Sequence, residues 1–187
     1  MKYRERFKEC LFNPTEDQVI ERDPLIAFSF YLSGRVSVLC EFAEEIVDNL
    51  HKGFSSECVD GARVTRAESL MWLWVLGAYE VVRTMHQAKQ CFSERLAQEL
   101  LALKNQLAVV RMPAAKMEKR GINVAVTSNR SPNGWDFKNH DLLINDPDDK
   151  NVSARQILAD FDRVFCSISK ADVLAHHEAS YKEWLKT

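Results

Sequence analysis

Long stretches of apolar residues at helical spacing dominate this 187-residue sequence. The clearest stretch carries apolar side chains at steps of three or four residues: Phe28, Leu32, Val36, Leu39, Ala43, Ile46 and Leu50. This spacing places them on one side of an α-helix, where they pack against another helix. Only six glycines and five prolines are available to interrupt such helices. The sequence therefore predicts a mainly α-helical protein.

Capping residues and prolines give the expected limits of the first three helices. A short first helix is expected around residues 3–11, where an Asn-Pro pair follows. The second helix is expected over residues 24–51, because Asp23 can cap its start and Pro24 is suited to the first helical position. Thr65 and Glu68 form a capping-box pattern, which predicts that the third helix covers residues 65–90.

Three more helices are expected further along the chain. Ser93 is the predicted N-cap of the fourth helix, which Pro113 is expected to kink or end because proline clashes with the preceding turn. Ser153 is the predicted N-cap of the next helix, with a row of apolar residues from position 157 to 168. A last helix is expected over residues 171–185.

The hydrophobic period changes from helical to alternating after residue 121. Apolar residues alternate over 122–126, a segment rich in turn-forming residues follows, and alternation resumes over 135–137. This pattern predicts a β-hairpin, with residues 142–144 as a possible third strand. We therefore expect a hairpin insertion over residues 122–144.

Length and composition fit one globular domain. The chain has 187 residues, 46% of them hydrophobic and 28% charged, which is an ordinary balance for a protein with a single core. We predict one domain over residues 1–187, in which five or six helices form a bundle. The bundle comprises residues 1–121 and 152–187, and the hairpin is inserted between them.

The chain carries no sequence signal of export, membrane insertion or a cofactor. Its five cysteines are scattered without a CxxC pair, which favours reduced thiols in a cytoplasmic protein. No run approaches the roughly 18 consecutive apolar residues of a membrane helix. Phosphate-loop, dinucleotide-binding and metalloprotease motifs are absent from the sequence. We therefore expect no membrane association, no metal and no cofactor.

The expected third helix is apolar on two opposite sides. One side carries Leu70, Trp74, Gly77, Val81 and Met85, and the other carries Trp72, Leu76 and Tyr79. A helix of this kind is either central in a monomer or covered by a second subunit, and twofold pairing is the commonest way to cover it. We expect a homodimer. In the second helix, Gly34 is interpreted as a notch for close helix packing.

Three polar residues follow one another at steps of three on the expected third helix. Glu80, Arg83 and His86 form a row in an otherwise apolar segment. One interpretation is an ion pair between Glu80 and Arg83 within the helix, with His86 near its end. The other is a catalytic site in which Arg83 stabilises an anion and His86 or Glu80 exchanges protons, as phosphodiester or acyl chemistry requires.

A locally basic segment surrounds Pro113. Candidate anion-binding residues there are Arg111, Lys116, Lys119 and Arg120. The whole chain has 25 basic and 27 acidic residues, so it has no global basic field. Nucleic acid is therefore an expected partner only through this local patch.

The predicted hairpin carries candidate partner-binding residues. These are Trp135, Phe137 and His140, because aromatic side chains are frequent at binding hot spots. The alternative is that Trp135 and Phe137 fold back onto the helical core.

The sequence supports two hypotheses for the function of this protein. The first is an interaction or regulatory protein, dimeric and helical, whose hairpin recognises a protein partner. The alternative is a metal-independent hydrolase or ribonuclease with its polar site on the third helix.

Overall fold

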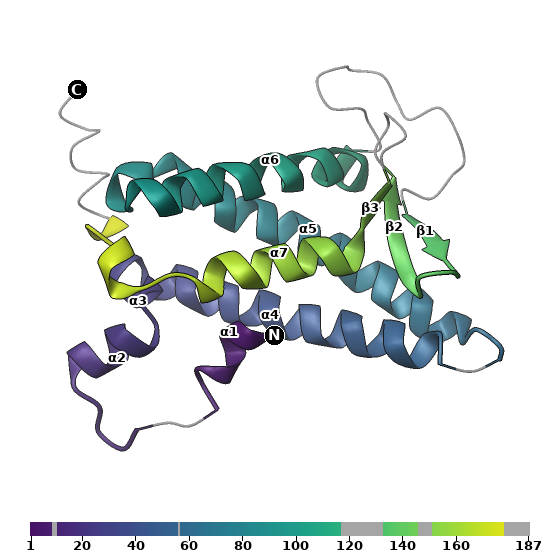
Figure 1. Ribbon diagram of the computed structural model, residues 1–187, viewed down its shortest axis with the longest axis horizontal. Coiled ribbons are helices and arrows are strands. Elements are labelled where there is room, and N and C mark those ends of the chain that lie inside the picture. Colours follow the sequence, from purple (N-terminus) through teal and green to yellow (C-terminus); the bar gives the residue numbers. More distant parts are fainter. Residues whose placement is uncertain (9–10, 56, 117–132, 146–150, 178–187) are drawn as a thin grey trace.

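Three long antiparallel helices form a layer in the centre of the structure (Figure 1). The computed structural model describes residues 1–8, 11–55, 57–116, 133–145 and 151–177. The layer consists of α4 (Phe30–Gly53), α5 (Gly61–Gln87) and α6 (Glu94–Lys116). Helix α5 lies between the other two, and α7 (Ala154–Cys166) crosses one side of the layer. The mainly α-helical fold with a small inserted sheet is therefore confirmed.

The N-terminal segment contains more and shorter helices than expected. They are α1 (Lys2–Glu5), α2 (Glu16–Arg22) and α3 (Leu25–Phe28). The first helix therefore ends earlier than expected. Helix α2 was not predicted, although Thr15 and Gln18 form a complete capping box at its start.

The expected helix over residues 24–51 is divided at Ser29. This residue has extended backbone angles, and its hydroxyl accepts a hydrogen bond from the backbone N–H of Leu32 at 3.3 Å. The buried carboxylate of Asp23 stabilises the break because it accepts hydrogen bonds from the backbone of Leu25 and the hydroxyl of Ser33. Ser29 is thus the N-cap of α4.

Helix α5 begins four residues before the predicted start. Its N-cap is Asp60, whose carboxylate accepts hydrogen bonds from the backbone N–H groups of Ala62 and Arg63. Thr65 lies inside the helix, where its carbonyl accepts a hydrogen bond from the Ser69 hydroxyl. The capping box predicted at Thr65 was therefore wrong, because an aspartate further upstream satisfies the first amides.

Two other predicted caps are confirmed. Helix α6 follows the short 3₁₀ turn η1 (Lys89–Cys91). At its start, the Ser93 hydroxyl accepts a hydrogen bond from the backbone N–H of Leu96 at 3.3 Å. The Ser153 hydroxyl accepts the backbone N–H of Gln156 at 3.0 Å at the start of α7. Helix α6 continues past position 113 to Lys116, so proline does not end it there.

The sheet has three antiparallel strands in the order β1-β2-β3. They are β1 (Asn133–Asp136), β2 (Asp141–Asn145) and β3 (Asn151–Ser153). In the β1-β2 hairpin, Trp135 pairs with Leu142 and Asp136 with Asp141. The predicted third strand, residues 142–144, is thus β2, and it pairs with β1, where the strand over residues 135–137 was predicted. Residues 122–132, with the predicted first strand, lie outside the described residues, and β3 was not predicted.

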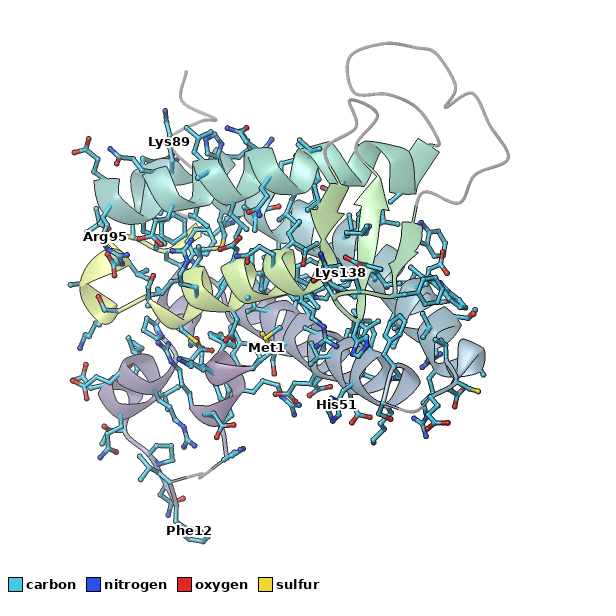
Figure 2. All side chains as sticks on the ribbon, turned by 45° about the vertical axis from the view of Figure 1, so that its right-hand side comes forward. Met1, Phe12, His51, Lys89, Arg95 and Lys138 are labelled. Carbon is cyan, nitrogen blue, oxygen red and sulfur yellow. The ribbon has the colours of Figure 1, made fainter. Side chains whose placement is uncertain are left out.

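Residues 171–176 do not form the start of the α-helix expected over residues 171–185, although His177 is helical. The segment contains a 3₁₀ turn, η2 (Lys170–Asp172), and Val173 then forms a β-bridge with Phe92. The buried carboxylate of Asp172 accepts hydrogen bonds from Ser93 and Arg95 at 2.6 Å each. Figure 2 shows Arg95 at the end of the bundle that lies opposite the sheet. Residues 178–185 lie outside the described residues.

The main core lies between the three-helix layer and α7. Trp74 of α5 is fully buried, its ring lies 5.2 Å from that of Phe161 of α7, and its indole N–H donates to the Leu39 carbonyl. Figure 1 shows α7 on only one side of α5. The other side of α5 carries the exposed side chains Trp72 and Leu73, and it is the side on which the candidate sites lie.

Candidate functional site

Glu80 and Arg83 form an ion pair on the outer side of α5. The Nε of Arg83 donates to a carboxylate oxygen of Glu80 at 2.8 Å, and Nη2 of Arg83 lies 2.7 Å from the same oxygen. The Nη1 of Arg83 donates to the Gln87 side chain at 3.0 Å. The Glu80 and Arg83 side chains are 45% and 39% exposed. This is the intrahelical pair that the spacing predicted, and it lies near the surface.

Arg111 of the neighbouring helix α6 joins this pair. Its Nη2 lies 3.7 Å from Glu80, and its guanidinium lies 4.9 Å above the ring of Tyr79. Two guanidinium groups therefore share one carboxylate. The sequence placed Glu80 and Arg111 in separate candidate sites, but the fold brings them together.

His86 lies further along α5, beside Lys104 of α6. The Lys104 ammonium is 3.2 Å from Nδ1 of His86, a distance at which the ammonium donates to an unprotonated ring nitrogen. Partial burial lowers the pKa of His86, and the positive charges of Lys104 and Lys89 lower it further. His86 is therefore a neutral imidazole at neutral pH, and Lys104 was not predicted as part of this site.

The other predicted anion-binding residues are only partly described. Lys116 is the last residue of α6. Lys119 and Arg120 lie outside the described residues. Of the predicted basic set, the structure thus assigns a side-chain position to Arg111 alone.

The aromatic residues of the hairpin pack against the turn between α4 and α5. The His140 ring is stacked on that of Phe54 at 5.5 Å, and the Phe137 ring contacts the same phenylalanine edge-on at 6.2 Å. Trp135 is partly buried against the core, whereas Phe137 is 61% exposed. The hairpin is therefore anchored by Trp135, and it presents Phe137 to solvent.

An apolar groove runs between the outer sides of α4 and α5. It has a volume of about 460 Å³, and its lining includes Tyr31, Gly34, Val38 and Gly77. A methyl group on Gly34 would have no atom within 4 Å, whereas one on Gly77 would lie 3.0 Å from Leu39. The predicted notch at Gly34 was therefore wrong as a helix contact, because Gly34 opens the groove and Gly77 forms the close contact.

The described part of the chain offers no cluster of three or more His, Cys, Asp or Glu side chains that could hold a metal ion. Among its helices, none combines the length and apolar character needed to cross a membrane. Comparisons with protein-family models, curated proteins and solved structures find no match.

Proposed function

We propose that this chain is a helical interaction protein that pairs with a second copy of itself through the outer face of α4 and α5. The observation that carries the proposal is the apolar face formed by Phe30, Tyr31, Val38 and Leu73 around Gly34. Phe30 and Tyr31 are 78% and 68% exposed, and Val38 and Leu73 are 47% exposed each. These side chains belong to adjacent antiparallel helices, as the ion pair of Arg66 with Glu45 and the contact of Gly77 with Leu39 indicate.

The extent of this face supports pairing. Taking roughly 200 Å² for a fully exposed aromatic side chain, Phe30 and Tyr31 leave about 300 Å² in contact with water. Val38 and Leu73 extend the area to about 400 Å², the size at which an exposed patch on a monomer is often functional. A stable interface buries roughly 800 Å² per partner, so this apolar face would supply about half of that area and the polar residues around it the rest.

The shape of this face supports a twofold arrangement. The groove at Gly34 is a hollow, and Phe30, Val38 and Leu73 are projecting side chains next to it. A twofold axis presents the same surface twice, so that the projections of one copy meet the hollow of the other. Burying these side chains removes apolar surface from water, which contributes about 25 cal/mol per Å² before the cost of association is subtracted.

The test is the mass of the protein in solution, measured by sedimentation velocity over a concentration series. The wild-type chain is expected to reach twice its 21.5 kDa mass. Val38→Glu is expected to give a monomer, because it places a charge from each copy in the apolar interface. Gly34→Leu provides a second variant, since a Cβ atom at position 34 has no atom within 4 Å and the larger side chain would occupy space in the hollow.

Val47→Glu is the matched control. Val47 is on the same helix and is 36% exposed. It lies about one helical turn after Glu44, whose carboxylate pairs with Met1 and with Arg4 of α1. Val47 is therefore on another side of α4. The control is expected to remain a dimer. A wild-type chain that stays monomeric throughout the series would refute self-association, and equal behaviour of the two valine variants would refute this face.

A further inference from the structure

A second pocket lies next to the groove at Gly34, at the end of the bundle where α4 begins beside α3 (Figure 1). It has a volume of about 520 Å³, and its walls come from the first turns of α4, the last turns of α5 and His177. The His177 ring packs edge-on against the buried ring of Phe28 at 5.3 Å, which fixes that wall. A pocket of this size is large enough for a small molecule.

Arg35 brings to this pocket a positive charge that has no acidic partner among the described residues. It is the single charged residue between positions 24 and 40, and the positions one helical turn before and after it hold no acid. Its guanidinium lies 4.5 Å from the ring centre of Tyr31, and Nη2 donates to the hydroxyl of the same tyrosine. The tyrosine therefore orients the guanidinium without neutralising it.

The acid that lines the pocket, Glu80, does not neutralise Arg35. Its carboxylate is held by Arg83, which is one helical turn further along α5 and lies 2.7 Å from one of its oxygens. The charges of Glu80 and Arg83 cancel, which leaves the charge of Arg35. A carboxylate in the wall also repels a second negative charge on a ligand. A monoanion therefore fits the pocket better than a dianion such as a phosphate monoester.

Two hydroxyl groups of the same pocket can donate hydrogen bonds to an anion. The Tyr31 hydroxyl accepts from Arg35 and the Ser29 hydroxyl accepts from the backbone N–H of Leu32, so each keeps its own hydrogen to donate. Neither of them donates to another group within the part of the chain that the structure describes. The Thr84 hydroxyl, in contrast, already donates to the Glu80 carbonyl at 2.8 Å. The donors beside Arg35 suit a carboxylate, because its oxygens only accept.

Apolar side chains complete the walls of the pocket. Leu32 and Val81 line it and are otherwise buried. An apolar group of a ligand would leave water there, while its charged group would stay beside Arg35. We propose that this pocket binds a small monocarboxylate with an apolar body, whose carboxylate pairs with Arg35 and the Tyr31 hydroxyl. The pocket is formed within one copy of the chain, so this site is independent of pairing.

The experiment titrates the full chain with phenylacetate and follows the chemical shifts of the backbone amides by NMR. Saturable binding is expected, with a Kd on the order of 0.1–1 mM for a ligand of this size. The amides that shift are expected at the start of α4 and near the end of α5. Phenylacetamide has the same apolar body without the charge, so it is expected to bind about tenfold more weakly. Inorganic phosphate is expected not to displace phenylacetate.

Two variants test the residues that bind the carboxylate. Arg35→Gln is expected to weaken phenylacetate binding about tenfold or more, because it removes the charged partner, and to leave phenylacetamide binding unchanged. Tyr31→Phe keeps the ring under the guanidinium but removes one donor, so it is expected to weaken phenylacetate binding about threefold. Far-UV circular dichroism establishes that each variant is folded.

Two further variants are controls. Arg63→Gln is matched to Arg35→Gln, because Arg63 pairs with Asp60 at 3.6 Å at the start of α5, outside the pocket. Leu73→Glu places a charge in the face proposed for pairing, but Leu73 does not line the pocket. Both are expected to bind phenylacetate as the wild type does, whatever mass the wild-type chain has in sedimentation. The failure of the pairing proposal would therefore leave this site unaffected.

Several results would overturn the proposal. Absence of saturable binding, or shift changes away from the start of α4, would show that the pocket does not take this ligand. Equal affinity for phenylacetamide, or an unchanged Kd in folded Arg35→Gln, would show that the guanidinium does not bind the carboxylate. Displacement of phenylacetate by inorganic phosphate would show a site for any anion. Binding that needs both the charge and Arg35 would support the proposal.

Discussion

Removing the carboxylate of Asp172 is expected to destabilise the fold strongly. This side chain accepts hydrogen bonds from the Ser93 hydroxyl and Arg95 at 2.6 Å each, and from the Ser169 hydroxyl and backbone N–H at 2.7 and 3.0 Å. It thereby links the start of α6 to the turn η2. The side chain of Asp172 is 9% exposed, so water replaces few of these bonds.

The magnitude follows from these contacts. Breaking a buried, hydrogen-bonded charge pair costs about 3–5 kcal/mol. Because Arg95 is 46% exposed and regains water, the lower end of that range applies. We expect Asp172→Ala to reduce the free energy of unfolding by about 3 kcal/mol, which for a chain of this size lowers the Tm by about 6–12 °C.

The effect also depends on pH. Burial by itself raises the pKa of Asp172, but hydrogen bonds from Ser93, Arg95 and Ser169 outweigh it and hold the pKa well below its ordinary value. A carboxyl whose pKa is lower in the folded state stabilises the fold above its unfolded pKa, near 4, and this contribution is lost as the pH falls through the folded value. The difference between wild type and Asp172→Ala is therefore full at pH 7 and shrinks below about pH 4.

Urea unfolding followed by circular dichroism, at neutral pH and at about pH 3, measures both effects. Asp17→Ala is the matched control, because Asp17 also pairs with a cation of the same turn, Lys170, but is 81% exposed. Its Tm is expected to remain that of the wild type. A loss below 1 kcal/mol for Asp172→Ala, or a loss of the same size at both pH values, would refute this reasoning.

Two further predictions concern the ends of the long helices and the hairpin. Gly53→Ala is expected to lower the Tm through a loss of about 1–3 kcal/mol, because the new methyl group would lie 2.7 Å from Val64; an unchanged melting curve would contradict the close contact. Trp135→Ala is expected to lower the free energy of unfolding by about 2 kcal/mol, because the Trp135 ring is partly buried. Phe137 is 61% exposed, so Phe137→Ala is expected to lower it by less than about 1 kcal/mol. Comparable losses in urea unfolding would show that both aromatic residues support the core.

Local signals in the sequence predicted much of the fold. The apolar spacing predicted the long helices, and Ser93 and Ser153 marked the starts of α6 and α7 because a cap depends on residues only three positions apart. The break at Ser29 was missed because the row of apolar residues continues through it. The break is fixed by the buried Asp23, which also accepts a hydrogen bond from the Tyr3 hydroxyl, 20 residues away.

The contacts of the candidate site were likewise predictable only in part. The pairing of Glu80 with Arg83 was predictable, because residues three apart meet on the surface of a helix. The arrival of Arg111 beside Glu80, and of Lys104 beside His86, depends on how α5 packs against α6. Neither contact has a local signal, since the partners are separated by 31 and 18 residues.

The amino-acid sequence alone determined the helical class of this protein, several helix starts and the presence of an apolar surface on the helix that became α5. Only the tertiary structure decided which side of α5 is covered by α7 and which remains open, and that Gly34 borders an empty groove instead of a neighbouring helix. The physical reason is the distance along the chain over which each kind of interaction acts. Helix propensity and capping act within a few residues, whereas grooves and shared ion pairs arise when distant segments pack together.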